Sequence, residues 1–437
     1  MLRKVIAISL AGILTVLLGS CGTAKDGGTT KEESKEATVT IMWQEEVSEQ
    51  FWDLPLKQFK EKYPNVEVNF ESNAKAYDVI RNLLNIQEAP DIFYSWISDV
   101  DYYGFAEEDL LYSVDDILAE NNAEETKSLA DTIFAAGLEL GELDGKHYFL
   151  PTSKLLAGNF YSGSFFTEKG WTIPQTWSEF KTLSAAIKAD GQAVPMIYSG
   201  VYPFMLADAF LIPMIQNLDP GTLEAINNNE SGAWKQPAAV EALTRLQEMR
   251  DQGYIDKNSL SMDHIQSQIE FIGYNAAFVP SGSWLEGEME DQWPEDFDLQ
   301  PMYAPGEEAD VTSTTAVVEC MVLPKQENDD NLEYVKELVK LFYSEENAKY
   351  VAEQTGFLLA LEEEDKEVLN LLPASARTMW EMADDQVTII TPSYKVKYKE
   401  VLEELNNCIN ALIQEEINAE QFSERMDQAA REIGNEE

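Results

Sequence analysis

The chain contains 437 residues, of which 79 are acidic and 31 are basic, so its formal net charge is −48 at pH 7. A chain this acidic is repelled by nucleic acid phosphates and by anionic lipid surfaces, which argues against proteins that bind either one through charge. With only two histidines, neither a metal cluster nor a Ser/His/Asp triad is supported, and we expect no metal and no cofactor. The length is sufficient for two domains.

The first 20 residues have the features of a bacterial lipoprotein signal peptide. Two basic residues precede an apolar run, 5–18, that is shorter than the ~20 residues a transmembrane helix needs. The sequence LGSC at 18–21 then matches a lipobox, whose small residues allow cleavage before the cysteine. We expect Cys21 to carry the lipid that anchors the protein at the extracytoplasmic face of the cell membrane. Residues 21–37 are polar and are expected to form a flexible linker.

The folded part is expected to begin with alternating strands and helices. The patterns predict strands at 38–43, 66–70 and 90–94, with helices from about 48 to 63 and from about 76 to 87. Strand–helix–strand–helix–strand over so few residues predicts a mainly parallel sheet with helices on both faces.

A second unit of the same α/β kind is expected from about residue 150. The segment Thr176-Trp177-Ser178-Glu179 is a capping box that opens a helix to about 189. The acidic, proline-broken stretch 291–310 is expected to hold little regular structure. The other predicted elements are strands at 191–198 and 316–323 and helices at about 203–216, 237–252, 262–271, 331–343, 345–354, 397–415 and 418–433.

Three residues with reactive side chains are given structural roles. Cys320 lies in an apolar strand pattern and is expected to be a buried thiol, while Cys408 lies in a helical pattern. A disulfide between these two cysteines stays open at this point. His147 follows a predicted turn and is expected at the surface or in a strand.

Five segments in order resemble the extracellular solute-binding proteins of ABC importers, in the carbohydrate-binding group that includes maltose-binding protein. The match spans nearly all of 38–437. The segments are TVTIMWQEEVSEQFWDLPLKQFKEKYPNVEVNFE at 38–71, APDIF at 89–93, DGKHYFLP at 144–151, IPQTWSEF at 173–180 and GYNAAFVPSGSW at 273–284. Two departures concern ligand contacts: the family's Tyr-Asn-Lys run is replaced near residue 160, and its Pro and Arg after Thr355-Gly356 are absent.

The resemblance implies a two-lobed periplasmic-binding-protein-like fold with a hinge between the lobes. Lobe 1 is expected to comprise 38–148 and about 314–365, and lobe 2 about 149–313 and 366–437. It also implies a binding protein that is not an enzyme. The implied partners are a carbohydrate ligand, of oligosaccharide size, and the permease subunits of an ABC importer. We expect a monomer.

The ligand site is predicted from side chains that follow strands. A sugar offers C–H faces to aromatic rings and hydroxyls to polar groups, and ligands of α/β sheets bind beyond the carboxyl ends of the strands. The candidate residues are Trp43, Gln44, Glu45, Ser95, Trp96, Asn159, Tyr161, Trp284 and Tyr394. By resemblance, Trp284 is the best candidate for a stacking platform.

Two other interpretations stay open. The same fold could bind a cationic solute, a polyamine or an amino sugar, because Glu45 and other acids lie near the predicted site. A surface-anchored carbohydrate-active enzyme would need two placed carboxylates, and with 79 acidic residues such pairs arise by chance.

Overall fold

The computed structural model describes residues 37–45, 49–363 and 365–433. The predicted signal peptide, Cys21 and nearly all of the linker lie outside these residues. Within the described part, no helix is both long enough and apolar enough to cross a bilayer.

The first strands and helices form as predicted. Strands β1 (Thr38–Gln44), β2 (Glu67–Asn73) and β3 (Ile92–Tyr94) are parallel, and β1 lies in the middle. Helices α1 (Asp53–Lys62) and α2 (Ala76–Asn85) make the two crossovers between them. Parallel strands need such crossovers because each must start again at the same edge of the sheet.

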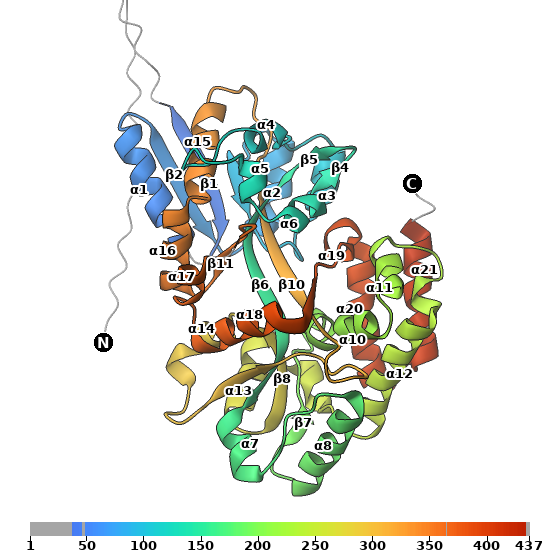
Figure 1. Ribbon diagram of the computed structural model, residues 1–437. Helices are drawn as coiled ribbons and strands as arrows, with labels where there is room; N and C mark the ends of the chain where they lie inside the picture. Colours follow the sequence, from blue (N-terminus) through green and yellow to red (C-terminus); the bar gives the residue numbers. More distant parts are fainter. Residues whose placement is uncertain (1–36, 46–48, 364, 434–437) are drawn as a thin grey trace, which may run out of the picture. The chain divides into compact units, whose positions relative to one another are not determined.

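Two long strands join this part of the sheet to the rest (Figure 1). Strands β10 (Thr312–Val322) and β6 (Phe149–Ser162) are antiparallel, with a register irregularity between Glu319 and Cys320. Beyond β6 come β8 (Ala276–Gly282) and β7 (Val194–Met196), which are parallel to each other. The order is β2-β1-β3-β10-β6-β8-β7. The predicted α/β class is therefore confirmed, with a sheet that is mixed where β6 and β10 run.

Short strands pair with both long strands. The expectation of little regular structure at 291–310 is wrong in part, because β9 (Leu299–Met302) pairs with β6. Strands β11 (Leu358–Leu359) and β12 (Val387–Ile390) pair with β6 and β10. A separate hairpin, β4 (Glu142–Leu143) and β5 (Lys146–His147), places His147 in a strand as predicted.

The helices cover both parts of the sheet (Figure 1). The remaining α-helices are α3 (Tyr102–Glu107), α4 (Asp115–Leu118), α5 (Leu129–Thr132), α6 (Ala135–Leu140), α7 (Gly163–Lys169), α8 (Trp177–Asp190), α9 (Phe204–Leu206), α10 (Ile212–Leu218), α11 (Pro220–Asn227), α12 (Pro237–Asp251), α13 (His264–Ile272), α14 (Leu285–Glu288), α15 (Leu332–Phe342), α16 (Glu345–Thr355), α17 (Lys366–Leu369), α18 (Ala374–Gln386), α19 (Tyr394–Lys397), α20 (Lys399–Ile413) and α21 (Ala419–Ile433).

The predicted capping box opens α8. The Oγ1 of Thr176 accepts a hydrogen bond from the backbone N–H of Glu179 at 3.3 Å, and the Glu179 carboxylate accepts from the N–H of Thr176. Gly191 ends the helix at φ 76°, a left-handed conformation that favours glycine.

Buried apolar side chains form three clusters on the faces of the sheet. Cys320 on β10 and Cys408 on α20 belong to two different clusters, and both are unpaired and fully buried. Burial raises the pKa of the Cys408 thiol to about 12, so neither thiol is placed for reaction in this fold.

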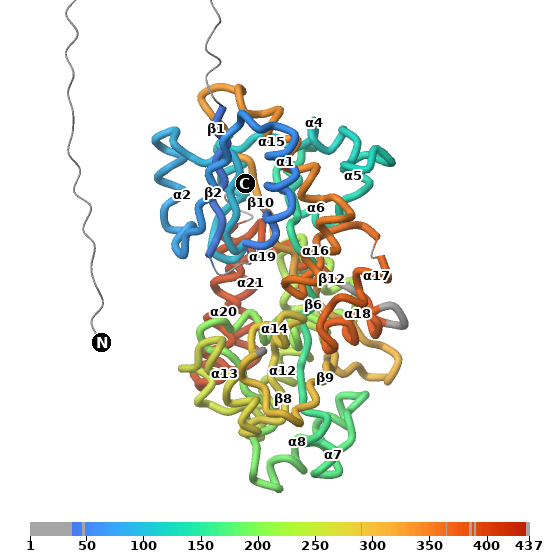
Figure 2. Tube along the Cα trace, turned by 90° about the vertical axis from the view of Figure 1, so that its left-hand side faces the viewer, coloured from blue at the N-terminus to red at the C-terminus, as the bar shows by residue number. Residues whose placement is uncertain are grey.

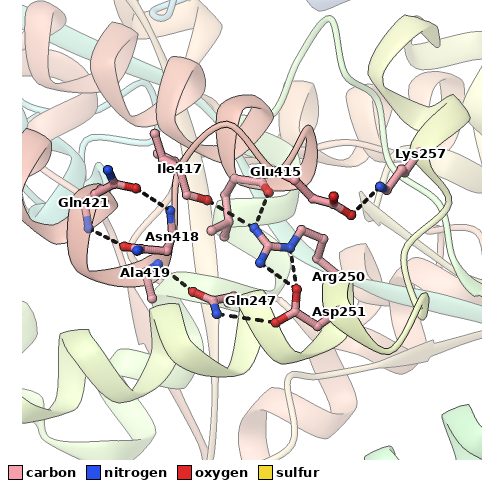
Figure 3. A network of polar contacts seen from close by, with 10 residues as sticks. Gln247, Arg250, Asp251, Lys257, Glu415, Ile417, Asn418, Ala419 and Gln421 are labelled. Carbon is pink, nitrogen blue, oxygen red and sulfur yellow. Dashed lines mark hydrogen bonds and ion pairs between the residues drawn. The ribbon is translucent and has the colours of Figure 1, made fainter.

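A polar network ties the last two helices to α12 (Figure 3). Arg250 on α12 donates from Nη1 to the carbonyl oxygens of Leu412 and Ile417, at 2.9 and 3.1 Å. Gln247, one turn earlier, accepts from the N–H of Ala419 at 2.7 Å. A guanidinium is suited to the unpaired carbonyls at a helix end, so Arg250 fixes the turn between α20 and α21.

Candidate ligand-binding site

The ends of β1 and β3 are joined by side-chain hydrogen bonds. Ser95 Oγ, just after β3, donates to Gln44 Oε1 at 3.0 Å, and Gln44 Nε2 donates to the carbonyl of Ala74. The hydroxyl of Tyr102 is bonded to the backbone of Ser95. Gln44 and Ser95 are both fully buried. They therefore hold the two strand ends together, and their side chains already form hydrogen bonds within the protein.

The ring of Trp43 lies in the core. It is 0% exposed and stacks on Tyr94 at a centroid distance of 4.3 Å, with Trp52 edge-on at 5.6 Å. Strand β1 lies between two parallel neighbours and is covered on both faces, so a residue near its end packs inward. The structure gives this ring a packing role, and its contact with a ligand stays a prediction.

Trp96 and Glu45 are more accessible. Trp96 is half-buried, with its ring edge-on to Tyr94 at 6.2 Å, and Glu45 is exposed. These two residues follow β3 and β1, so the carboxyl ends of adjacent parallel strands present one aromatic ring and one carboxylate. This matches the arrangement that the sequence predicts at this edge of the sheet.

Trp284 follows β8 and its ring lies directly over a glycine. A Cβ atom built at Gly282 would come within 2.0 Å of the Trp284 ring, so only a residue without a side chain allows this position. Trp284 is half-buried, and among the described residues no other aromatic ring or cation stacks on it. One face of the indole is supported by backbone and the ring is partly open to solvent.

A buried carboxylate on β10 holds the loop that contains Trp96. Glu319 on β10 is 5% exposed and accepts a hydrogen bond from the N–H of Ile97 at 2.9 Å. Burial raises the pKa of its carboxyl to about 8, although this hydrogen bond and the charge of Lys395 act in the opposite direction. Ile97 and Leu285, the residues after Trp96 and Trp284, belong to one apolar cluster. We use the name strand-end site for Gln44, Glu45, Ser95, Trp96 and Trp284, which lie at or just after the ends of β1, β3 and β8.

The remaining three predicted residues lie on other elements and already pack or form hydrogen bonds within the protein. Asn159 on β6 is fully buried and donates to the carbonyl of Ala209 at 2.9 Å. Tyr161 is half-buried and packs on Phe166 at 4.8 Å. Tyr394 is 0% exposed in an apolar cluster, and burial raises the pKa of its hydroxyl well above the ordinary value. The contact of these three side chains with a ligand stays a prediction.

A buried ion pair that sequence reasoning missed lies near Glu319. Lys395 pairs with Asp208, which is 2% exposed, and lies over the ring of Phe204 at 4.9 Å. Asp208 belongs to a short π-helix, Ala207–Leu211, inserted between α9 and α10. Burial raises the pKa of the Asp208 carboxyl, against the effect of Lys395. The partners are 187 residues apart, so no local pattern marks them.

A pocket of about 700 Å³ is lined by none of the predicted site residues. Lys154 on β6 is 5% exposed, donates to the carbonyl of Leu361, and lies 4.5 Å from the ring of Phe134 and 5.4 Å from that of Trp380. The Lys154 pocket is lined by Phe134, Ala136, Glu139, Leu140, Glu142, Lys154, Asn227, Asn228, Trp380, Thr391, Ser393, Lys397 and Tyr398. Its size is in the range of small-molecule sites.

Neither region is built to hold a metal. In the part of the chain that the structure describes, no three His, Cys, Asp or Glu side chains are grouped so that they could bind an ion. The two regions instead combine aromatic rings with hydrogen-bonding groups, which suits a neutral or weakly charged organic ligand.

Comparisons with known proteins identify the family. Residues 43–349 match the model of the bacterial extracellular solute-binding proteins. The chain is 23% identical over 319 residues to a multiple sugar-binding protein of Streptococcus mutans, covering 70% of each chain. It is 27% identical over 196 residues to the diacetylchitobiose binding protein NgcE of Streptomyces coelicolor, covering 44% of this chain and 40% of that one.

A solved structure of a chitin oligosaccharide binding protein has the same fold. Its TM-score is 0.73 at 19% identity, over 91% of this chain and 98% of that one. This likeness confirms the predicted fold, and the matched family consists of binding proteins and not of enzymes. The chain therefore belongs to the bacterial extracellular solute-binding proteins.

Proposed function

We propose that this protein captures a carbohydrate, an oligosaccharide in particular, at the strand-end site. The observation that carries the proposal is Trp284, whose ring rests on Gly282 and remains partly open. An indole held in this way is a platform for the C–H face of a sugar, and the carboxylate of Glu45 can accept hydrogen bonds from its hydroxyls. The similar proteins are named for binding multiple sugars, diacetylchitobiose and chitin oligosaccharides, which supports the same ligand class.

The proposed cycle is capture without chemistry. Lobe 1 is proposed to comprise 38–148 and about 314–365, and lobe 2 about 149–313 and 366–437. A sugar bound to one lobe gains contacts with the other, so its differential affinity favours the closed state. The loaded protein then delivers the sugar to the permease of an ABC importer. A lipid on Cys21 keeps it at the extracytoplasmic face of the membrane, with residues 21–37 as the linker.

A thermal-shift screen of the lipid-free chain from residue 22 onward tests the ligand class. The ligands are diacetylchitobiose, chitin oligosaccharides, raffinose, a xylo-oligosaccharide and, for the cationic alternative, spermidine. A ligand present at 100 times its Kd adds about 2.7 kcal/mol of stability, and we expect this shift with at least one oligosaccharide. A shift with spermidine alone, one that disappears in high salt, would replace the carbohydrate proposal with the cationic one.

A further inference from the structure

The segment 394–399 carries three lysines that contact different parts of the molecule. It comprises α19 and the first residue of α20, and its lysines occupy positions 395, 397 and 399. Helix α19 lies beside α3 (Figure 1), between the part of the molecule that holds β1 and β2 and the part that holds α20 (Figure 2). In the proposed division, α3 belongs to lobe 1 and α19 to lobe 2, so this segment is in position to join the two lobes.

One of the three lysines holds the segment to lobe 2. Lys395 is largely buried in its ion pair with Asp208, and its ammonium lies 4.9 Å from the centre of the Phe204 ring. Just before α19, Ser393 donates from Oγ to the carbonyl oxygen of Asn227 at 2.7 Å. A buried ion pair is costly to break, because each charge would be left without its partner. The position of lobe 2 therefore determines what the other two lysines can reach.

The other two lysines contact lobe 1. Lys399 Nζ donates to the carbonyl oxygen of Asp99 at 2.7 Å, although the two residues are 300 positions apart. The ammonium of Lys397 lies 5.7 Å from the centre of the Tyr103 ring on α3, within the range of a cation–π contact. The bond of Lys399 goes to a main-chain oxygen, so it depends on the path of the backbone there and not on the side chain at position 99.

The Asp99 carbonyl belongs to the turn that carries Trp96. The N–H of Asp99 donates to the carbonyl oxygen of Trp96 at 3.0 Å, which closes this turn. Ile97, the next residue after Trp96, donates its N–H to Glu319 on β10 at 2.9 Å. Glu319 thus holds the first part of the Trp96 turn, and Lys399 holds its last residue. Both holding side chains come from distant parts of the sequence.

We propose that Lys399 is a positioning residue, which holds the Trp96 turn for the sugar from the opposite lobe. The bond to the Asp99 carbonyl forms only when the two lobes are in contact, so the position of the Trp96 ring is coupled to that contact. The proposal rests on the proposed function, since it gives Trp96 a ligand. A sugar on the positioned ring then favours the lobe contact, because its affinity for that arrangement is higher.

Hydrogen exchange of the sugar-free chain from residue 22 onward tests the positioning. Lys399→Met keeps most of the apolar stem and removes the ammonium. We expect the amides of Ile97 and Asp99 to exchange about 10-fold faster, as for loss of a hydrogen bond from a charged group. Lys399→Arg, whose guanidinium can donate to the same oxygen, should restore the wild-type rate. Lys188→Met is the matched control, because Lys188 also donates to a main-chain carbonyl, that of Gln252, within proposed lobe 2.

Calorimetric titration with the best sugar from the screen tests the coupling. The Kd should rise about 10-fold in Lys399→Met and return to the wild-type value in Lys399→Arg, while Lys188→Met should bind like the wild type. Wild-type affinity in Lys399→Met overturns the coupling.

The exchange data separate this proposal from the proposed function. Unchanged exchange of the Trp96 turn in Lys399→Met overturns the positioning role. Faster exchange spread evenly over the chain also overturns it, because that result indicates a general loss of stability. Absence of sugar binding by the wild type overturns the proposed function, whereas the exchange of the sugar-free chain still decides whether Lys399 holds the turn.

Discussion

The strand-end site and the Lys154 pocket both combine aromatic rings with polar groups, but their rings differ in what already covers them. Trp380 in the pocket is 6% exposed and has the ammonium of Lys154 over its ring at 5.4 Å. Trp284 rests on the backbone of Gly282 and is half-buried. The Lys154 pocket has a volume of about 700 Å³, whereas the strand-end site has the ring that is partly open. A ligand that stacks needs the second property, so volume alone does not identify the site.

The largest expected effect is a dependence of folding stability on pH, which arises from Glu319 beneath the Trp96 loop. The Glu319 carboxyl has a pKa of about 8 when folded and an ordinary value of 4.5. The folded state therefore binds an extra proton between these values, and the stability from this group is present below pH 4.5 and is lost as pH rises through 8. At about 1.4 kcal/mol per pKa unit, the change is on the order of 5 kcal/mol.

Chemical denaturation from pH 4 to 9 measures this effect. Glu319→Gln should remove the decrease in the free energy of unfolding with pH that Glu319 causes. Glu139→Gln, at the exposed rim of the Lys154 pocket, should keep the wild-type dependence on pH. Equal slopes in wild type and Glu319→Gln would show that the carboxyl is not buried as described.

Trp380→Ala is expected to cost stability and to leave ligand binding intact. Removing a buried Trp from a core costs about 3–5 kcal/mol, and Trp380 belongs to an apolar cluster. Denaturation and the thermal shift with sugar measure the two properties separately. A variant that folds but no longer responds to sugar would move the proposed site to the Lys154 pocket.

Trp284→Ala should have the opposite pattern. The ligand-linked stabilisation of about 2.7 kcal/mol at 100 times Kd should vanish, because the stacking face is gone. The loss of stability without ligand should be smaller than for Trp380→Ala, since Trp284 is only half-buried. Retention of the full shift would contradict Trp284 as the platform.

The smallest expected effect is the loss of stability in Thr176→Ala. This variant is a control, because it changes neither the strand-end site nor the Lys154 pocket. Thr176→Ala removes one half of the capping box at the start of α8, and such a loss costs about 1 kcal/mol. The thermal shift with sugar should equal that of the wild type. Any reduction would mean that general loss of stability, and not the site, lowers the signal in the other variants.

Local patterns predicted most of the fold but little of the site's geometry. Alternating apolar residues and the Thr176 capping box identified β1, β2 and α8, because their signals lie within a few residues. Strand β9 was missed, since it exists through pairing with β6 about 140 residues earlier. Position after a strand selected both Trp43 and Trp96, and sequence alone could not show that the first is covered on both faces.

The position of the Trp284 ring over Gly282 restricts which residue can occupy position 282. A single methyl group at position 282 would displace the indole, because a Cβ there would lie 2.0 Å from the ring. Under the proposed function, a one-carbon change at position 282 would therefore alter ligand binding without replacing Trp284.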